Sequence, residues 1–165
     1  MLRGGILTVS DKGARGERRD DGSKRIRQCL CSLNIEWVSY EIVPDEKDII
    51  MAKLRDWSDE VALDLLVTTG GTGLSPRDVT PEATMAVIER VVPGFAEVMR
   101  AEGLKKTPMA VLSRAVAGIR GRTLIINLPG SPKAVEECLE AISPALPHAM
   151  ETLRGEAEEC ASSNK

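Results

Sequence analysis

Short apolar runs alternate along this chain with segments in which apolar residues recur at helical spacing. Four runs that end at polar, glycine or proline residues predict strands at 6–9, 37–43, 63–69 and 123–128. Helical spacing begins at Ser23, at 45–46, at Thr80, at Phe95 and near Lys133. Because apolar strands are separated by helices, the pattern predicts an α/β fold with a mostly parallel sheet covered on both faces.

The helix that begins near Thr80 has recognisable boundaries. Thr80 suits the N-cap position and Pro81 suits the first helical residue. We expect this helix to continue to about Val92, where Pro93 and Gly94 break it.

The last helix is expected over about residues 133–153, and Pro144 and Pro147 should interrupt or bend it. The chain has 165 residues, with no internal repeat and no linker. That length suits one domain, which we expect over residues 1–155, followed by a short polar tail at 156–165.

The amino-acid composition argues against several classes of function. Apolar residues make up 42% of the chain and charged residues 28%, which is typical of a globular protein. The net charge of −3 and the few aromatic residues argue against a nucleic-acid binder, which needs a basic surface and stacking side chains. No apolar run is long enough to span a membrane, and the first residues lack a signal-peptide core. We therefore expect a cytoplasmic protein without nucleic-acid or membrane partners.

Few residues are available for zinc binding or for hydrolysis by a nucleophile and histidine. The cysteines are Cys29, Cys31, Cys138 and Cys160, and His148 is the single histidine. One C-x-C pair and one histidine do not make a typical zinc site, so we expect reduced cysteines. A lone histidine near the end also disfavours a Ser-His or Cys-His mechanism. We therefore expect any chemistry in this protein to use carboxylates, cationic side chains and backbone amides.

A glycine-rich turn follows the third predicted strand. Its residues are Thr69, Gly70, Gly71, Thr72 and Gly73. Ligands of parallel sheets bind beyond the carboxyl ends of the strands, and consecutive glycines let several N–H groups face one anion. The turn is neither a Walker A loop nor G-x-G-x-x-G. A phosphate cradle and a purely structural turn both remain open.

Two aspartates occupy the same edge of the predicted sheet. Asp78 lies just beyond the glycine-rich turn, and Asp45 follows the second strand. A carboxylate beside a phosphate cradle repels the phosphate unless a cation lies between them, which indicates Mg²⁺. The alternatives are that Asp78 only orders its loop and that Asp45 only caps the following helix.

A second strand-to-helix turn offers another anion site. It contains Pro129, Gly130, Ser131, Pro132 and Lys133 at the start of a predicted helix, and helix N-termini favour anions. Ser10, Ser113 and Arg114 supply further possible donors. A basic stretch near the N-terminus is either a solvated face or a region that attracts a polyanionic substrate. It consists of Arg15, Arg18, Arg19, Lys24, Arg25 and Arg27.

Taken together, these motifs resemble the MogA/MoaB family of molybdenum-cofactor synthesis. The matching stretches are 7–11, 43–46, 68–73, 77–83, 93–97, 112–114 with 117–118, and 127–133. They cover nearly the whole chain in the family's order, and 43–46 and 77–83 look more like the MogA, catalytic side. One departure is the sequence Asp20-Asp21-Gly22-Ser23, because the family often reads Asp-x-Ser-Gly there.

The resemblance implies a three-layer α/β/α sandwich, a homotrimer, and Mg²⁺-dependent transfer of AMP from ATP to molybdopterin, with release of pyrophosphate. A non-catalytic molybdopterin-binding or assembly protein, as on the MoaB side, is the alternative. Asp45 and Asp78 would be the catalytic and metal-binding residues. Substrate would be bound by Ser10, Asp11, Asp20, Thr69, Gly70, Gly71, Thr72, Gly73, Ser113, Arg114, Pro129, Gly130, Ser131, Pro132 and Lys133. The molybdenum-insertion protein of the same pathway is a further expected partner.

Overall fold

The computed structural model describes residues 1–156, which contain a six-stranded sheet in the order β2-β1-β3-β6-β5-β4. The strands are β1 (Leu2–Val9), β2 (Ile35–Val43), β3 (Leu65–Thr69), β4 (Arg90–Val91), β5 (Ala117–Arg120) and β6 (Thr123–Leu128). The strands β2, β1, β3 and β6 are parallel, whereas β5 and β4 are antiparallel to their neighbours. The expected mostly parallel sheet is therefore confirmed.

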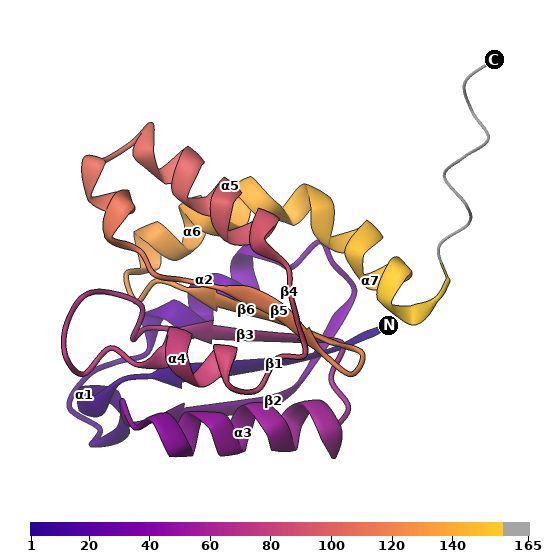
Figure 1. Cartoon of the computed structure of the whole chain (residues 1–165), viewed down its shortest axis with the longest axis horizontal. Helices are drawn as coiled ribbons and strands as arrows, with labels where there is room; N and C mark the ends of the chain where they lie inside the picture. Colours follow the sequence, from indigo (N-terminus) through magenta and orange to yellow (C-terminus); the bar gives the residue numbers. More distant parts are fainter. Residues whose placement is uncertain (157–165) are drawn as a thin grey trace.

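Helices cover both faces of the sheet (Figure 1). They are α1 (Asp11–Ala14), α2 (Asp21–Cys29), α3 (Lys47–Asp59), α4 (Thr80–Met85), α5 (Pro93–Leu104), α6 (Pro132–Ile142) and α7 (Leu146–Arg154), with 3₁₀ turns η1 (Pro108–Leu112) and η2 (Ser143–Ala145). One apolar cluster packs α3 and α4 on one face, and another packs α2, α5, α6 and α7 on the other. The three-layer α/β/α arrangement is confirmed.

The central strands are apolar on both faces because each face supports one of these clusters. On β3, Leu65 and Val67 join the cluster beneath α5 and α6, whereas Leu66 between them joins the cluster beneath α3. Successive side chains of a strand point to opposite faces, so a strand covered on both sides needs no polar positions. These clusters fix the strand ends, where the loops gather.

The helix expected over residues 80–92 is wrong in its second half. Helix α4 ends at Met85, and Arg90–Val91 form β4, paired antiparallel with β5. Local periodicity does not reveal this pairing, because β5 is short and contains alanine and glycine, which favour strands weakly. Thr80 is not the N-cap either: Val79 occupies that position, and the Thr80 hydroxyl donates to the Gly70 carbonyl at 3.0 Å.

The expected interruption of the last helix is confirmed. Helix α6 ends at Ile142, and the 3₁₀ turn η2, which contains Pro144, separates it from α7, which has Pro147 in its first turn. Residues 157–165 of the expected polar tail lie outside the described residues. Within the part of the chain that the structure describes, no helix is both long enough and apolar enough to cross a membrane.

Candidate active site

Two cavities meet at the carboxyl ends of the parallel strands. The first, here the polar cavity, measures about 620 Å³ and lies between the ends of β1 and β3, α2 and the turn before α6. The second, the apolar cavity, measures about 480 Å³ and lies between the glycine-rich turn, α5, η1 and α6. Gly71, Asp78, Gly130 and Ser131 line both cavities.

The structure brings most of the expected site residues to these cavities. Those at the polar cavity are Ser10, Asp20, Asp45, Thr69, Gly70, Gly71, Asp78, Gly130, Ser131 and Pro132. Those at the apolar cavity include Thr72, Gly73, Ser113 and Pro129. Asp11, Arg114 and Lys133 line neither cavity.

The glycine-rich turn needs glycine for its backbone conformation. Gly70 has a φ of +97° and Gly71 a φ of +66°, which side-chain-bearing residues rarely adopt. A Cβ on Gly70 would lie 2.3 Å from the Val9 carbonyl oxygen, and one on Gly71 would lie 2.3 Å from Oγ1 of Thr80. The chain therefore passes too close to its neighbours for any side chain at these two positions.

Substitution of Gly71 by alanine is expected to damage both stability and ligand binding. The methyl group would strain the backbone and displace Thr80, at a cost of about 1–3 kcal/mol of unfolding free energy. It would also lie 3.1 Å from Oδ1 of Asp45 and so disturb that carboxylate. Urea denaturation and ATP titration check this, with Gly94→Ala as the control, because a Cβ there meets nothing within 4 Å. Wild-type ATP affinity in Gly71→Ala would show that the turn is only structural.

Asp45 is held in place by a reciprocal pair of hydrogen bonds with Asp11. The Asp11 N–H donates to Asp45 Oδ2 at 2.8 Å, and the Asp45 N–H donates to Asp11 Oδ1 at 3.0 Å. Asp45 does not cap α3, because Glu46 is the N-cap residue. Arg77 donates two hydrogen bonds to the Asp11 carboxylate, from Nε to Oδ2 at 3.0 Å and from Nη2 to Oδ1 at 2.9 Å. Asp11 thus orients Asp45 from outside the cavities.

The two aspartates of this pair differ in acidity. Hydrogen bonds from Arg77 hold the pKa of Asp11 below its ordinary value. Burial raises the pKa of Asp45 above its ordinary value, and the negative charges of Asp11 and Asp78 raise it further. The hydrogen bond from the Asp11 N–H lowers this pKa, but by less than the other effects raise it. A half-buried carboxylate that resists ionisation among other carboxylates is suited to a cation.

Asp78 lies on a loop that is held in place by hydrogen bonds from Arg114. The Asp78 carboxylate accepts from the Ser75 N–H at 3.0 Å. Arg114 donates to the carbonyls of Gly73 and Asp78, both at 2.7 Å, and pairs with Glu82. Its guanidinium therefore joins both ends of the loop, and it supports Asp78 from outside the cavities.

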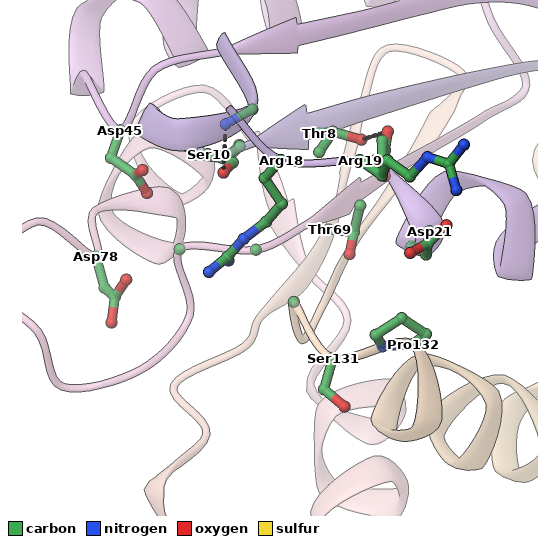
Figure 2. Close-up of a pocket in the computed structure, with 17 residues that line it drawn as sticks. Thr8, Ser10, Arg18, Arg19, Asp21, Asp45, Thr69, Asp78, Ser131 and Pro132 are labelled. Carbon is green, nitrogen blue, oxygen red and sulfur yellow. Dashed lines mark hydrogen bonds between the residues drawn. The ribbon is translucent and has the colours of Figure 1, made fainter. Parts of the chain in front are cut away.

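The two carboxylates fit a Mg²⁺ site completed by phosphate. They lie on the same side of the polar cavity (Figure 2). A Cβ on Gly73 would be 2.8 Å from Asp78 Oδ2, so both carboxylates flank the glycine-rich turn. No cluster of three or more potential metal ligands occurs among residues 1–156. Because Mg²⁺ is usually held by one or two carboxylates, substrate phosphates and water, these donors suit it.

Only part of the basic stretch reaches the site. Arg18 and Arg19 line the polar cavity, and Figure 2 shows the Arg18 side chain extending between Asp45 and Thr69. Arg15 instead pairs with Glu17 at 2.9 Å. Arg18 and Arg19 were missing from the expected site residues, although their place in the loop after β1 was a usable signal. Their position favours attraction of a polyanion over a merely solvated face.

Asp20 caps α2 at the wall of the polar cavity. Its Oδ1 accepts from the Ser23 N–H at 3.0 Å, and its Oδ2 accepts from the hydroxyls of Thr8 at 2.6 Å and Tyr40 at 2.8 Å. Burial opposes ionisation of Asp20, but these hydrogen bonds lower its pKa below the ordinary value. Asp20 is therefore an ionised acceptor, and the exchanged Gly22 and Ser23 do not prevent the cap.

Gly22 lies close to the end of β3. A Cβ on Gly22 would lie 3.0 Å from the Thr69 hydroxyl, which itself donates to the Pro129 carbonyl at 2.7 Å. Glycine at this position lets α2 approach the end of β3.

On the opposite wall of the polar cavity, Ser131 is the N-cap of α6, and its hydroxyl accepts a hydrogen bond from the Ala134 N–H at 3.5 Å.

The apolar cavity was largely missed from the sequence, because α5, η1 and α6 are far apart along the chain. Met99, Leu112 and Ala115 contribute to its wall. Arg100 lines it too, but its Nη1 donates to the Ala115 carbonyl at 2.9 Å. The cavity therefore suits a weakly polar group beside the glycine-rich turn.

Comparison with known proteins gives a consistent result. The family model described as "Probable molybdopterin binding domain" matches residues 5–148. A molybdopterin adenylyltransferase of Helicobacter pylori J99 is 48% identical over 153 residues, which are 92% of this chain and 87% of the relative. That of Escherichia coli K12 is 43% identical over 146 residues, 87% of this chain and 75% of the relative.

A solved structure of the molybdopterin biosynthesis enzyme MoaB from Thermus thermophilus is also similar. It is 59% identical, superposes with a TM-score of 0.89, and covers 94% of this chain and 98% of its own. The family match spans both strand-to-helix turns and both aspartates described above. This chain therefore belongs to the molybdopterin-binding domain family of molybdenum-cofactor biosynthesis, as the resemblance to MogA and MoaB indicated.

Proposed function

We propose that this chain is a cytoplasmic molybdopterin adenylyltransferase that uses ATP and Mg²⁺. An oxygen of the terminal phosphate of molybdopterin forms a bond to the α-phosphorus of ATP. The bond from that phosphorus to the bridging oxygen breaks, and pyrophosphate leaves with the electron pair. Because no protein nucleophile is required, the residues act by positioning the phosphates and neutralising their charge.

The polar cavity contains the groups for this task. The Gly71 backbone amide and the N-terminus of α6 offer donors to phosphate oxygens, whereas the Gly70 N–H donates to the Leu128 carbonyl at 3.1 Å. Arg18 and Arg19 add positive charge at the same wall. Asp45 and Asp78 are the residues that would hold Mg²⁺, which when bound neutralises phosphate charge and favours the departure of pyrophosphate.

One observation carries the proposal most directly. Asp45 and Asp78 come from different strand ends and flank one glycine-rich turn at the junction of two cavities. A domain that only binds a phosphorylated ligand gains nothing from two carboxylates beside the phosphate, because like charges repel. Two carboxylates with an intervening cation instead suit transfer between two phosphorylated substrates. The identity to named molybdopterin adenylyltransferases supports the same reaction.

The decisive experiment is an assay of pyrophosphate release. We expect the protein to release pyrophosphate from ATP only when molybdopterin and Mg²⁺ are both supplied, together with adenylylated molybdopterin. Molybdopterin binding without pyrophosphate would instead favour the non-catalytic alternative. That alternative is worth testing because a protein named MoaB is 59% identical to this chain.

We also propose a homotrimer, following the resemblance to the family. Large apolar side chains such as Leu74, Met109 and Val111 are more than 60% exposed in the isolated chain, which is typical of surfaces that pack against another copy. Light scattering is expected to give about three times the chain mass of 17.8 kDa. A mass near that of one chain would contradict the trimer.

A further inference from the structure

Glu137 on α6 places a carboxylate at the wall of the apolar cavity, where the proposed phosphoryl chemistry has no use for one. Its side chain is only 17% exposed, yet it lines the cavity. The nearest cation is Lys106, whose Nζ lies 3.9 Å from Oε1, beyond hydrogen-bond distance. A carboxylate that is mostly removed from water is costly unless donors satisfy it. A ligand that brings N–H donors would supply what the site lacks.

Among residues 1–156, no other side chain that lines this cavity forms a hydrogen bond or ion pair with Glu137. Burial raises the pKa of the neighbouring Cys138 thiol to about 11, so this thiol is uncharged at neutral pH. Arg100 is engaged with backbone carbonyls. Among the described residues that line the cavity, the other acid is Asp78, at the end shared with the polar cavity. Glu137 is thus the carboxylate available to a ring bound in the apolar cavity.

We propose that Glu137 determines specificity for the pterin ring of molybdopterin, by accepting hydrogen bonds from its 2-amino group and from N3–H. The proposal rests on the proposed function, since molybdopterin supplies the pterin. These two donors lie side by side on the 2-amino-4-oxopyrimidine edge and match the two oxygens of one carboxylate. Such a charge-assisted bidentate pair is strong and directional.

The same geometry discriminates against adenine. The corresponding edge of adenine presents one amino donor next to a ring-nitrogen acceptor, and the lone pair of that acceptor would face a Glu137 oxygen. Specificity of this kind arises from a repulsive contact with the wrong ligand as well as an attractive contact with the right one. The apolar cavity would therefore take the pterin and leave ATP to the polar cavity.

The test is a titration of free pterin, followed by its fluorescence, against the full chain and two variants. Glu137→Gln is expected to raise the Kd for pterin at least tenfold, about 1.4 kcal/mol, because the amide N–H₂ faces the ring donors. Glu140→Gln is the matched control: Glu140 lies on the same helix and 3.5 Å from the same Lys106, but is 61% exposed and outside the cavity. It should leave the Kd unchanged, and neither variant should change the Kd for ATP.

A second comparison needs no variant. Lumazine has a carbonyl where pterin has the 2-amino group, so wild-type protein should bind lumazine at least tenfold more weakly than pterin. Equal affinity for the two compounds, or an unchanged pterin Kd in Glu137→Gln, would overturn the proposal. Preference for pterin without pyrophosphate release from ATP would support the role of Glu137 while refuting the adenylyltransferase activity.

Discussion

Asp78→Asn is expected to lower the rate of adenylyltransfer by about a hundredfold to a thousandfold, which corresponds to about 3–4 kcal/mol of lost transition-state stabilisation. The carboxylate flanks the glycine-rich turn and lines both cavities, where it would face Mg²⁺ and the phosphates of ATP. Asparagine keeps an oxygen that can accept from the Ser75 N–H. The loop should therefore stay in place, and only the charge is removed.

Two measurements separate loss of charge from loss of structure. Thermal unfolding of Asp78→Asn should stay close to that of the wild type, since a partly exposed loop carboxylate adds little to packing and asparagine keeps the acceptor for the Ser75 N–H. The rate of pyrophosphate release should fall, while Asp48→Asn, which removes an exposed carboxylate on α3, should keep the wild-type rate. Full activity in Asp78→Asn would exclude this aspartate from the metal site.

Asp45→Asn is expected to produce an inactive protein that is more stable than the wild type at neutral pH. Activity should fall at least a hundredfold, because the second carboxylate that would hold Mg²⁺ is lost. Stability should rise because burial and the charges of Asp11 and Asp78 raise the pKa of Asp45 in the folded state. Asparagine can still accept from the Asp11 N–H, so the backbone contact between the two loops is retained.

The stability difference between Asp45→Asn and the wild type should depend on pH in a definite direction. An acid whose folded-state pKa is raised favours folding while both states are protonated. That stability is lost as the pH rises from the unfolded pKa, about 3.9, through the folded value. The advantage of Asp45→Asn should therefore be present at pH 7 and shrink in acid. Urea denaturation at several pH values measures it, and equal stability of both proteins at pH 7 would contradict the assignment.

Loss of the Asp45 charge should also appear in the wild type as the pH falls. Protonation of this carboxyl below its raised pKa removes one of the oxygens expected to hold Mg²⁺. Affinity for Mg²⁺-ATP, followed by calorimetry, should therefore weaken at a higher pH than an ordinary aspartate would cause. In Asp45→Asn that step should be absent, because asparagine does not titrate.

The sequence by itself determined the parallel core of the sheet and the glycine-rich turn. Both are local: an apolar run buried on two faces predicts a strand, and Gly70 and Gly71 predict a turn with unusual backbone angles. Asp45 and Asp78 could also be found, because each follows directly on a strand or turn whose position the pattern fixed. That they lie at one edge follows from parallel strands alone.

Only the tertiary structure decided how the remaining polar groups are used. Asp11 and Arg114 were expected to contact substrate, but one orients Asp45 and the other fastens the Asp78 loop. The pairing of β4 with β5, and the wall that places Glu137 in the apolar cavity, join segments well separated along the chain. Residue type and local spacing fix what a side chain is able to donate or accept. Which partner it meets depends on how distant elements pack, and that information is absent from any single stretch of sequence.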